Sequence, residues 1–141
     1  MSRITHVLDT SALLAHYFNE PGAGLVEGLW SDETLRVAVS AVTVAELKGR
    51  LHQEIADEAE ATKAADAYLN ELSTCLPVDR ATAEMAWQLR LVTPGRLPLV
   101  DALIAATARV AGAILVHKDP HLSQIPAGLV RQTPLSDNSE L

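Results

Sequence analysis

The sequence predicts an α/β fold in which a mostly parallel central sheet of five strands carries helices on both faces. Five short apolar runs rich in β-branched residues predict the strands. Segments with the apolar spacing of helices separate these runs, and strands that alternate with helices favour parallel pairing. Hydrophobic residues make up 48% of the chain but aromatic residues only 4%, so we expect a core of Ala, Leu, Val and Ile. The predicted strands occupy residues 4–8, 35–39, 75–78, 113–116 and 128–131.

The length of 141 residues fits one domain, expected at residues 1–132, with a frayed tail at residues 133–141 that is rich in Pro, Ser, Asp, Asn and Glu. No apolar run approaches the roughly 18 to 20 residues that cross a bilayer, and no basic start precedes an apolar block. These features predict a soluble, cytoplasmic protein without membrane contact. Cys75 has no partner for an internal disulfide and, within its apolar run, is expected in the core.

In the first half of the chain, a helix is predicted over residues 10–19, and the Glu-Pro-Gly run at residues 20–22 ends it. A short helix around residues 25–30 precedes the second strand. A longer helix then starts at about Thr43 and continues through the Ala- and Glu-rich residues 54–72, with room for an antiparallel hairpin of two helices.

In the second half, the third strand carries Pro77, which cannot donate a hydrogen bond to a neighbouring strand, so we expect this strand at an edge of the sheet. Asp79 is positioned to cap a helix at residues 81–91. A helix at residues 99–111 has Pro just before its start and Gly just after its end. The fourth strand is so apolar that we expect it inside the sheet.

The net charge of −7 argues against a general nucleic-acid coat protein, because such proteins need a basic surface to displace counterions. It does not exclude a nuclease, since a metal-dependent active site is itself a group of carboxylates. The eleven Lys and Arg residues can still form a local basic patch beside such a site.

Asp9 lies where the first strand gives way to a helix, because an apolar, β-branched run precedes it and helix formers follow at residues 12–15. In open parallel sheets, ligands bind in the crevice outside the carboxyl ends of the strands, so this carboxylate is a site candidate. The alternative is that Asp9, with Thr10 and Ser11, only caps the following helix.

Glu46 and Asp101 each have a functional and a local interpretation. Glu46 follows Thr43 at the spacing of a capping box, in which the carboxylate returns to the helix start. Asp101 projects from the rim of an apolar helix stripe, where an unpaired buried charge costs roughly several kcal/mol unless a cation or proton compensates it. Its local alternative is a first-turn acid that the helix dipole favours. Lys48 and Arg50 either pair with Glu46 or face a substrate.

Asp119 precedes Pro120, as an N-cap residue precedes proline at the first helical position, so capping alone would explain it. It also follows the fourth strand, as Asp9 follows the first. If those two strands are neighbours, the two carboxylates meet at one edge of the sheet, where the helices of Glu46 and Asp101 also begin. One pocket then explains all four residues.

Four carboxylates drawn together repel one another unless a divalent cation is present. Mg²⁺ is the expected cation because it takes oxygen ligands and keeps several waters. One or two such ions can activate water and stabilise the leaving oxygen of a phosphodiester. The chain has no Cys and His set for zinc, and Pro120 spoils the spacing of His117 and His121 for a helical metal pair.

The ordered set of acids resembles that of the PIN domain and, within that family, of the VapC-type toxin ribonucleases of type II toxin–antitoxin systems. The resemblance implies a three-layer α/β sandwich with a five-stranded parallel sheet, and Mg²⁺- or Mn²⁺-dependent endonucleolytic cleavage of RNA. It also implies a homodimer and inhibition by a cognate antitoxin. The motifs that carry the likeness are VLDTSAL at residues 7–13, TVAEL at 43–47, DALIAATA at 101–108 and LVHKD at 115–119.

By position, the resemblance assigns metal binding and catalysis to the four acids and an orienting role to Ser11. His117 stands where the family often has Thr or Ser, and His121 stands where many members have a second acid. Thr10 and His117 are further candidates for supporting roles. The cations expected to bind RNA are Lys48, Arg50, Arg96 and Lys118.

Two other functions fit weaker features of the sequence. Strand-terminal Asp residues and Lys118 late in the chain resemble a phosphoacceptor receiver domain, although an acidic pair after the first strand is missing. The other alternative is a PIN-like protein that only binds, whose acidic pocket receives an Arg from a partner protein. Metal-dependent cleavage of RNA distinguishes the nuclease from both.

Overall fold

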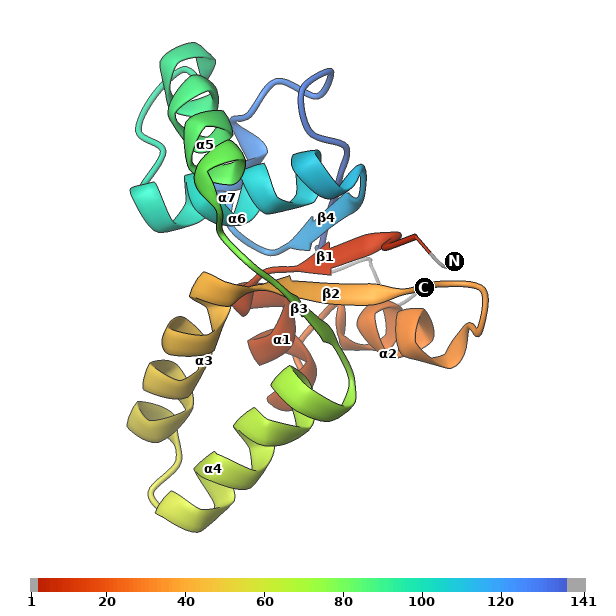
Figure 1. Cartoon of the computed structure of the whole chain (residues 1–141). Coiled ribbons are helices and arrows are strands. Elements are labelled where there is room, and N and C mark those ends of the chain that lie inside the picture. The colour runs from red at the N-terminus through yellow and green to blue at the C-terminus, as the bar shows by residue number, and fades with distance from the viewer. Residues whose placement is uncertain (1–2, 137–141) are drawn as a thin grey trace.

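The computed structural model describes residues 3–136, and a parallel sheet of five strands runs through them in the order β3-β2-β1-β4-β5 (Figure 1). All four strand pairings are parallel, as the sequence predicts for this fold class. The strands are β1 (His6–Leu8), β2 (Val37–Ser40), β3 (Thr74–Leu76), β4 (Ile114–His117) and β5 (Gln132–Pro134).

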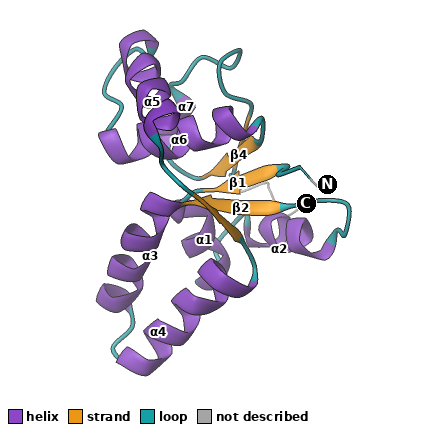
Figure 2. Cartoon of the chain, viewed as in Figure 1, coloured by secondary structure: helices purple, strands orange, loops and turns teal. Residues whose placement is uncertain are grey.

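Helices cover both faces of the sheet and complete a three-layer α/β sandwich (Figure 2). No helix within the described residues is long and apolar enough to span a membrane. One face carries α1 (Thr10–Tyr17), α2 (Ala23–Ser31), α3 (Ala41–Glu54), α4 (Glu58–Asp66) and the π-helix η1 (Ala67–Glu71). The other face carries α5 (Arg80–Val92), α6 (Leu99–Ala111) and the short α7 (Pro120–Ser123).

Alternate strand residues supply two separate core layers. Leu8 and Val116 lie in the layer with α1 to α4, whereas Val7 and Leu115 lie in the layer with α5 and α6. Side chains alternate because a strand has a period of two residues, and both sets are apolar because helices cover both faces. This arrangement explains why the strands appear in the sequence as continuous apolar runs.

Several element predictions are confirmed. β3 is at an edge of the sheet and β4 is inside it. The bounds of α6 agree with the predicted helix at residues 99–111, and Gly112 ends the helix with a left-handed φ of 68°. Asp79 caps α5, since its side chain accepts the amide of Thr82.

The prediction for the fifth strand is wrong. Residues 128–131 form turns, and β5 begins at Gln132. The predicted tail therefore starts too early, because Thr133 and Pro134 are in the strand and Leu135 is buried. Three residues at a sheet edge pair through their backbone, so this strand needs no apolar run that the sequence could display. The last part of the predicted tail, residues 137–141, lies outside the described residues.

Two further predictions need correction. Cys75 is exposed rather than buried, because β3 is an edge strand that pairs only with β2 among the strands of the sheet. The helix expected to continue through residues 54–72 is interrupted after α3, and Asp57 caps a new helix, α4. The two helices contact each other, which agrees with the hairpin that the sequence left open.

A crevice is expected where β1 and β4 end. These strands are neighbours, with Leu8 opposite Val116, but they lead to opposite faces of the sheet. Leu13 of α1 lies in one core layer and Leu122 of α7 lies in the other. When the chain leaves adjacent parallel strands in opposite directions, a ligand crevice opens at their carboxyl ends. The strand order also differs from the 2-1-3-4-5 order of receiver domains, which removes that alternative.

Candidate active site

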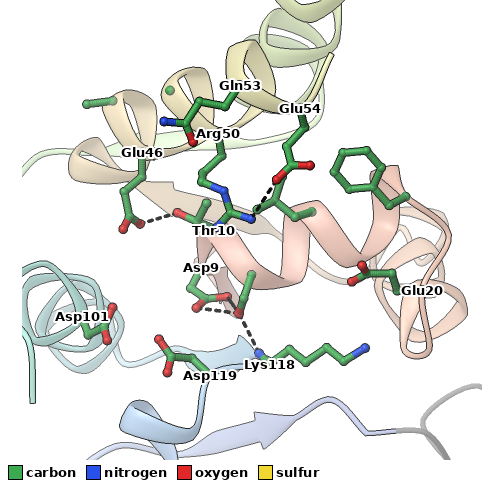
Figure 3. A pocket seen from close by; sticks show the side chains of 15 residues that line it. Asp9, Thr10, Glu20, Glu46, Arg50, Gln53, Glu54, Asp101, Lys118 and Asp119 are labelled. Carbon is green, nitrogen blue, oxygen red and sulfur yellow. Dashed lines mark hydrogen bonds and ion pairs between the residues drawn. The ribbon is translucent and has the colours of Figure 1, made fainter. Parts of the chain in front are cut away.

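The four carboxylates that the sequence singled out, from four parts of the chain, line one cavity of about 730 Å³ at the carboxyl end of the sheet, which Glu20 and Glu54 also line (Figure 3). Asp9 follows β1 and Asp119 follows β4. Glu46 comes from α3, and Asp101 from the first turn of α6. The structure therefore brings together the four acids that the sequence singled out.

Asp9 is both a helix cap and a member of the acidic group. Its Oδ1 accepts the amide of Ala12 at 2.9 Å, and Ser11 Oγ donates to its two oxygens at 2.7 and 2.9 Å. Only 3% of the residue is exposed. Burial raises the pKa of Asp9 to about 7 against the effect of these hydrogen bonds, and the nearby charges of Asp119 and Glu46 contribute to the rise.

Ser11 and Thr10 orient two of the carboxylates. Ser11 Oγ also accepts the amide of Lys118 at 2.8 Å, so it connects the ends of β1 and β4. Thr10 Oγ1 donates to Glu46 Oε1 at 2.5 Å. Both residues thus occupy supporting positions, one beside Asp9 and the other beside Glu46.

The capping box that the sequence offered as an alternative explanation of Glu46 is not formed. The helix begins at Ala41 directly after β2, and Ser40 caps it by accepting the amide of Val42 at 3.3 Å. Thr43 is therefore inside the helix rather than at its cap. Glu46 therefore does not cap the helix, and its carboxylate faces the cavity.

Asp101 and Asp119 lie close together within the acidic group. The pKa of Asp101 is raised to about 7, first by burial and then by the charge of Asp119 and a hydrogen bond between the two carboxyl groups. Asp119 also caps α7, because its Oδ1 accepts the amide of His121 at 2.8 Å. Capping and membership of the acidic group are compatible here, as they are for Asp9.

His117 supports the site from outside the cavity lining. Its Nδ1 accepts the amide of Asp119 at 3.1 Å, which leaves Nε2 as the donor to Gln132 Oε1 at 2.7 Å. Burial lowers the pKa of His117, so the ring stays neutral in this arrangement. The ring fixes the backbone that carries Asp119 and connects it to β5.

The predicted RNA-binding cations divide into two groups. Arg50 and Lys118 line the cavity, whereas Lys48 and Arg96 are exposed outside its lining. Arg50 pairs with Glu54 at 3.5 Å rather than with Glu46, and Lys118 Nζ donates to the carbonyl of Pro21 at 3.0 Å.

His121 lies beside two of the acids, although the sequence indicated only that it stands where many family members have a second acid. Its Nδ1 lies 3.3 Å from Asp119 Oδ1 and 3.8 Å from Asp101 Oδ2. Both ring nitrogens of His117 are engaged elsewhere, by the amide of Asp119 and by Gln132. The available signal was the position of His121 two residues after a capping Asp, because the capped amide holds this residue beside the carboxylate.

The acidic group fits a divalent cation. Within residues 3–136, no Lys or Arg pairs with any of the four carboxylates. Uncompensated acids at this depth are costly, and the raised pKa values of Asp9 and Asp101 reflect that cost. Ligand atoms of Asp101, Asp119 and His121 lie within 4.8 Å of one another, and carboxylate oxygens are the ligands that Mg²⁺ and Mn²⁺ prefer.

The family model for the PIN domain matches residues 6–128, which is most of the chain. The chain belongs to the PIN domain family. None of the curated proteins compared with this PIN domain matches it. Several solved structures share its fold, and three of them illustrate the likeness.

VapBC2 from Rickettsia felis, solved bound to a DNA fragment from its promoter, contains a chain that is 18% identical to this PIN domain, with a TM-score of 0.72 over 94% of this chain and 100% of that chain. A chain of VapBC-5 from Mycobacterium tuberculosis is 25% identical, with a TM-score of 0.69 over 93% of this chain and 98% of that chain. VapC20 from the same organism is a toxin that cleaves the sarcin–ricin loop. It is 23% identical, with a TM-score of 0.69 over 92% of this chain and 100% of that chain.

Proposed function

We propose that this PIN domain is a Mg²⁺- or Mn²⁺-dependent endoribonuclease that acts in the cytoplasm as the toxin of a toxin–antitoxin pair. The observation that supports it most strongly is the convergence of Asp9, Glu46, Asp101 and Asp119 on one cavity. Membership of the PIN family and the fold shared with VapC20, a sarcin–ricin loop cleaving toxin, support RNA as the substrate.

In this proposal Asp9, Glu46 and Asp101 hold the cation, and Asp119 completes the site or positions water. A cation bound there supplies an activated water and stabilises the leaving oxygen of the phosphodiester. The protein orients the ligands, since Ser11 holds both oxygens of Asp9 and Thr10 holds one oxygen of Glu46.

We assign the first contacts with RNA phosphates to Arg50 and Lys118, because both line the cavity. We assign Lys48 and Arg96, which are exposed outside the cavity lining, to a more distant part of the proposed RNA path. With a net charge of −7, the protein is expected to bind RNA modestly and in a salt-sensitive way.

The proposed protein partners are a cognate antitoxin and a second copy of the chain. The likeness to members of VapBC complexes supports the antitoxin. Exposed apolar residues on α5 support the homodimer, since Trp87 and Leu91 are each 63% exposed one helical turn apart.

Cleavage of total RNA by purified protein free of antitoxin tests the proposal. We expect cleavage with Mg²⁺ or Mn²⁺, none with EDTA, and a defined cleavage site when the new RNA ends are sequenced. Cleavage that continues in EDTA would rule out the metal mechanism. Absence of cleavage, together with absence of stabilisation by Mg²⁺, would favour the PIN-like protein that only binds.

A further inference from the structure

His121 places an imidazole nitrogen beside the carboxylate group. Asp119 caps α7 by accepting the amide of His121 at 2.8 Å, which fixes the backbone of this residue next to the carboxylate. The side chain turns back over the same group, so that Nδ1 lies 3.3 Å from Asp119 Oδ1 and 3.8 Å from Asp101 Oδ2. The cap therefore delivers the ring to the acids.

These separations suit donors that share one cation. With ligand distances of about 2.1 Å in octahedral coordination, adjacent donors lie about 3.0 Å apart and opposite donors about 4.2 Å apart. The measured nitrogen-to-oxygen distances of 3.3 and 3.8 Å fall between these two values. One cation can therefore contact Asp101, Asp119 and His121 after only small side-chain movements.

The two histidines near Asp119 differ in their freedom to bind a metal. Both ring nitrogens of the buried His117 are engaged, one by the Asp119 amide and the other by Gln132. The side chain of His121 is 45% exposed, and its ring faces the carboxylates of Asp101 and Asp119. His121 thus presents a nitrogen donor to the acidic group, whereas His117 accepts the backbone amide of Asp119.

A nitrogen donor changes which cation the site prefers. Mg²⁺ is a hard ion that takes oxygen ligands, whereas imidazole suits transition-metal ions. Replacing an oxygen donor with an imidazole nitrogen therefore moves the preference away from Mg²⁺ and toward first-row transition ions. Mn²⁺ also keeps the affinity for carboxylates that this site requires.

We propose that His121 is a nitrogen ligand of the bound divalent cation and that it makes this site select Mn²⁺ over Mg²⁺. The inference rests on the proposed function, because it concerns the same metal site. It adds a donor of a different chemical class to the four carboxylates.

Pulsed electron paramagnetic resonance of the full chain loaded with Mn²⁺, without RNA, tests the ligand directly. A bound imidazole couples its nitrogen nucleus to the electron spin of Mn²⁺. We expect this coupling in the wild type and its loss in His121→Asp, which keeps an oxygen donor at the position. His52→Asp, at an exposed histidine outside the cavity lining, should retain the coupling. His121→Gln provides a second, neutral variant.

Titration calorimetry with Mn²⁺ and with Mg²⁺ tests the selectivity. We expect the ratio of Mn²⁺ to Mg²⁺ affinity to fall by about tenfold or more in His121→Asp. Mutation of a group that a metal site depends on typically lowers its metal affinity by at least about tenfold. Mn²⁺ bound without nitrogen coupling, or an unchanged ratio in His121→Asp, would overturn the role of His121 and leave the nuclease proposal intact. A wild type that binds no Mn²⁺ would overturn both this inference and the proposed metal site.

Discussion

At the scale of single residues, capping and participation in a site can be distinguished by burial. Asp9 and Asp79 both cap helices through a side-chain oxygen. Asp79 is exposed, and hydrogen bonds from Thr82 lower its pKa, as expected for a cap alone. Asp9 is buried beside other acids, and burial raises its pKa. A cap needs no such environment, so capping alone leaves the burial of Asp9 unexplained.

The raised pKa of Asp9 predicts a pH-dependent stability. A carboxyl group whose pKa is raised by folding binds its proton more tightly in the folded state, so its contribution to stability is lost as pH rises from about 4 to about 7. From pH 6 to pH 8, the free energy of unfolding of the metal-free wild type should therefore fall by about 1 kcal/mol more than that of Asp9→Asn. Urea unfolding in EDTA at both pH values measures this difference.

The comparison with Asp9→Asn removes opposing effects in the same pH range. Burial lowers the pKa values of His6 and His117, so their contributions increase stability as pH rises through about 6.5, and they do so in both proteins. Asn at position 9 retains an oxygen for the Ala12 amide. If the free energy of unfolding has the same pH dependence in the wild type and in Asp9→Asn, then ionising the Asp9 carboxyl group does not destabilise the folded protein.

At the scale of elements, the start of α3 decides where Glu46 points. We expect Ser40→Ala to lower the free energy of unfolding by about 1 kcal/mol, because Ser40 Oγ caps the helix and also accepts the hydroxyl of Thr107. Thr43→Val should be neutral or stabilising, since Thr43 Oγ1 is buried and has no hydrogen-bond partner within the described residues. Urea unfolding of both variants compares the two positions. A larger loss for Thr43→Val than for Ser40→Ala would contradict Ser40 as the residue that stabilises the start of α3.

The sequence predicted best the elements whose ends carry distinctive residues. Proline before the helix and Gly112 after it fixed both ends of α6, and Asp79 marked the start of α5. The short polar strand β5 carried no such signal. The partner of Glu46 was also hidden, because Thr10 lies 36 positions away and a local motif offered Thr43 instead. Spacing rules describe neighbours in the chain, whereas this contact depends on how α1 and α3 pack.

At the scale of the whole molecule, the topology gathers the acids. The sequence predicted the cavity because strand ends and helix starts meet at one edge of a parallel sheet, and only the adjacency of β1 and β4 had to be assumed. No role could be assigned to His121 from the sequence, because its contacts with the acids depend on the turn between Asp119 and α7. The order of the elements thus locates the site, while the local turn determines which side chains reach it.

The apolar surface of α5 predicts association of two copies. Trp87 and Leu91 are exposed on this helix, so Leu91→Glu should place a charge in the interface and shift the protein toward monomers. Size-exclusion chromatography with light scattering measures the mass. Leu72→Glu, at an exposed apolar residue just after η1, is the matched control and should leave the mass unchanged. A wild type that is monomeric at the same concentration would contradict the expected dimer.

The rate of RNA cleavage by single acid variants tests most directly the claim that four carboxylates form one metal-dependent site. Initial rates on a labelled RNA, at fixed Mn²⁺ and Mg²⁺ concentrations, should fall by about 100-fold or more in Asp9→Asn, Glu46→Gln, Asp101→Asn and Asp119→Asn. Asp79→Asn alters a helix cap outside the cavity lining and should cleave at the wild-type rate. Wild-type rates in any of the four variants, with the fold intact, would contradict the shared site.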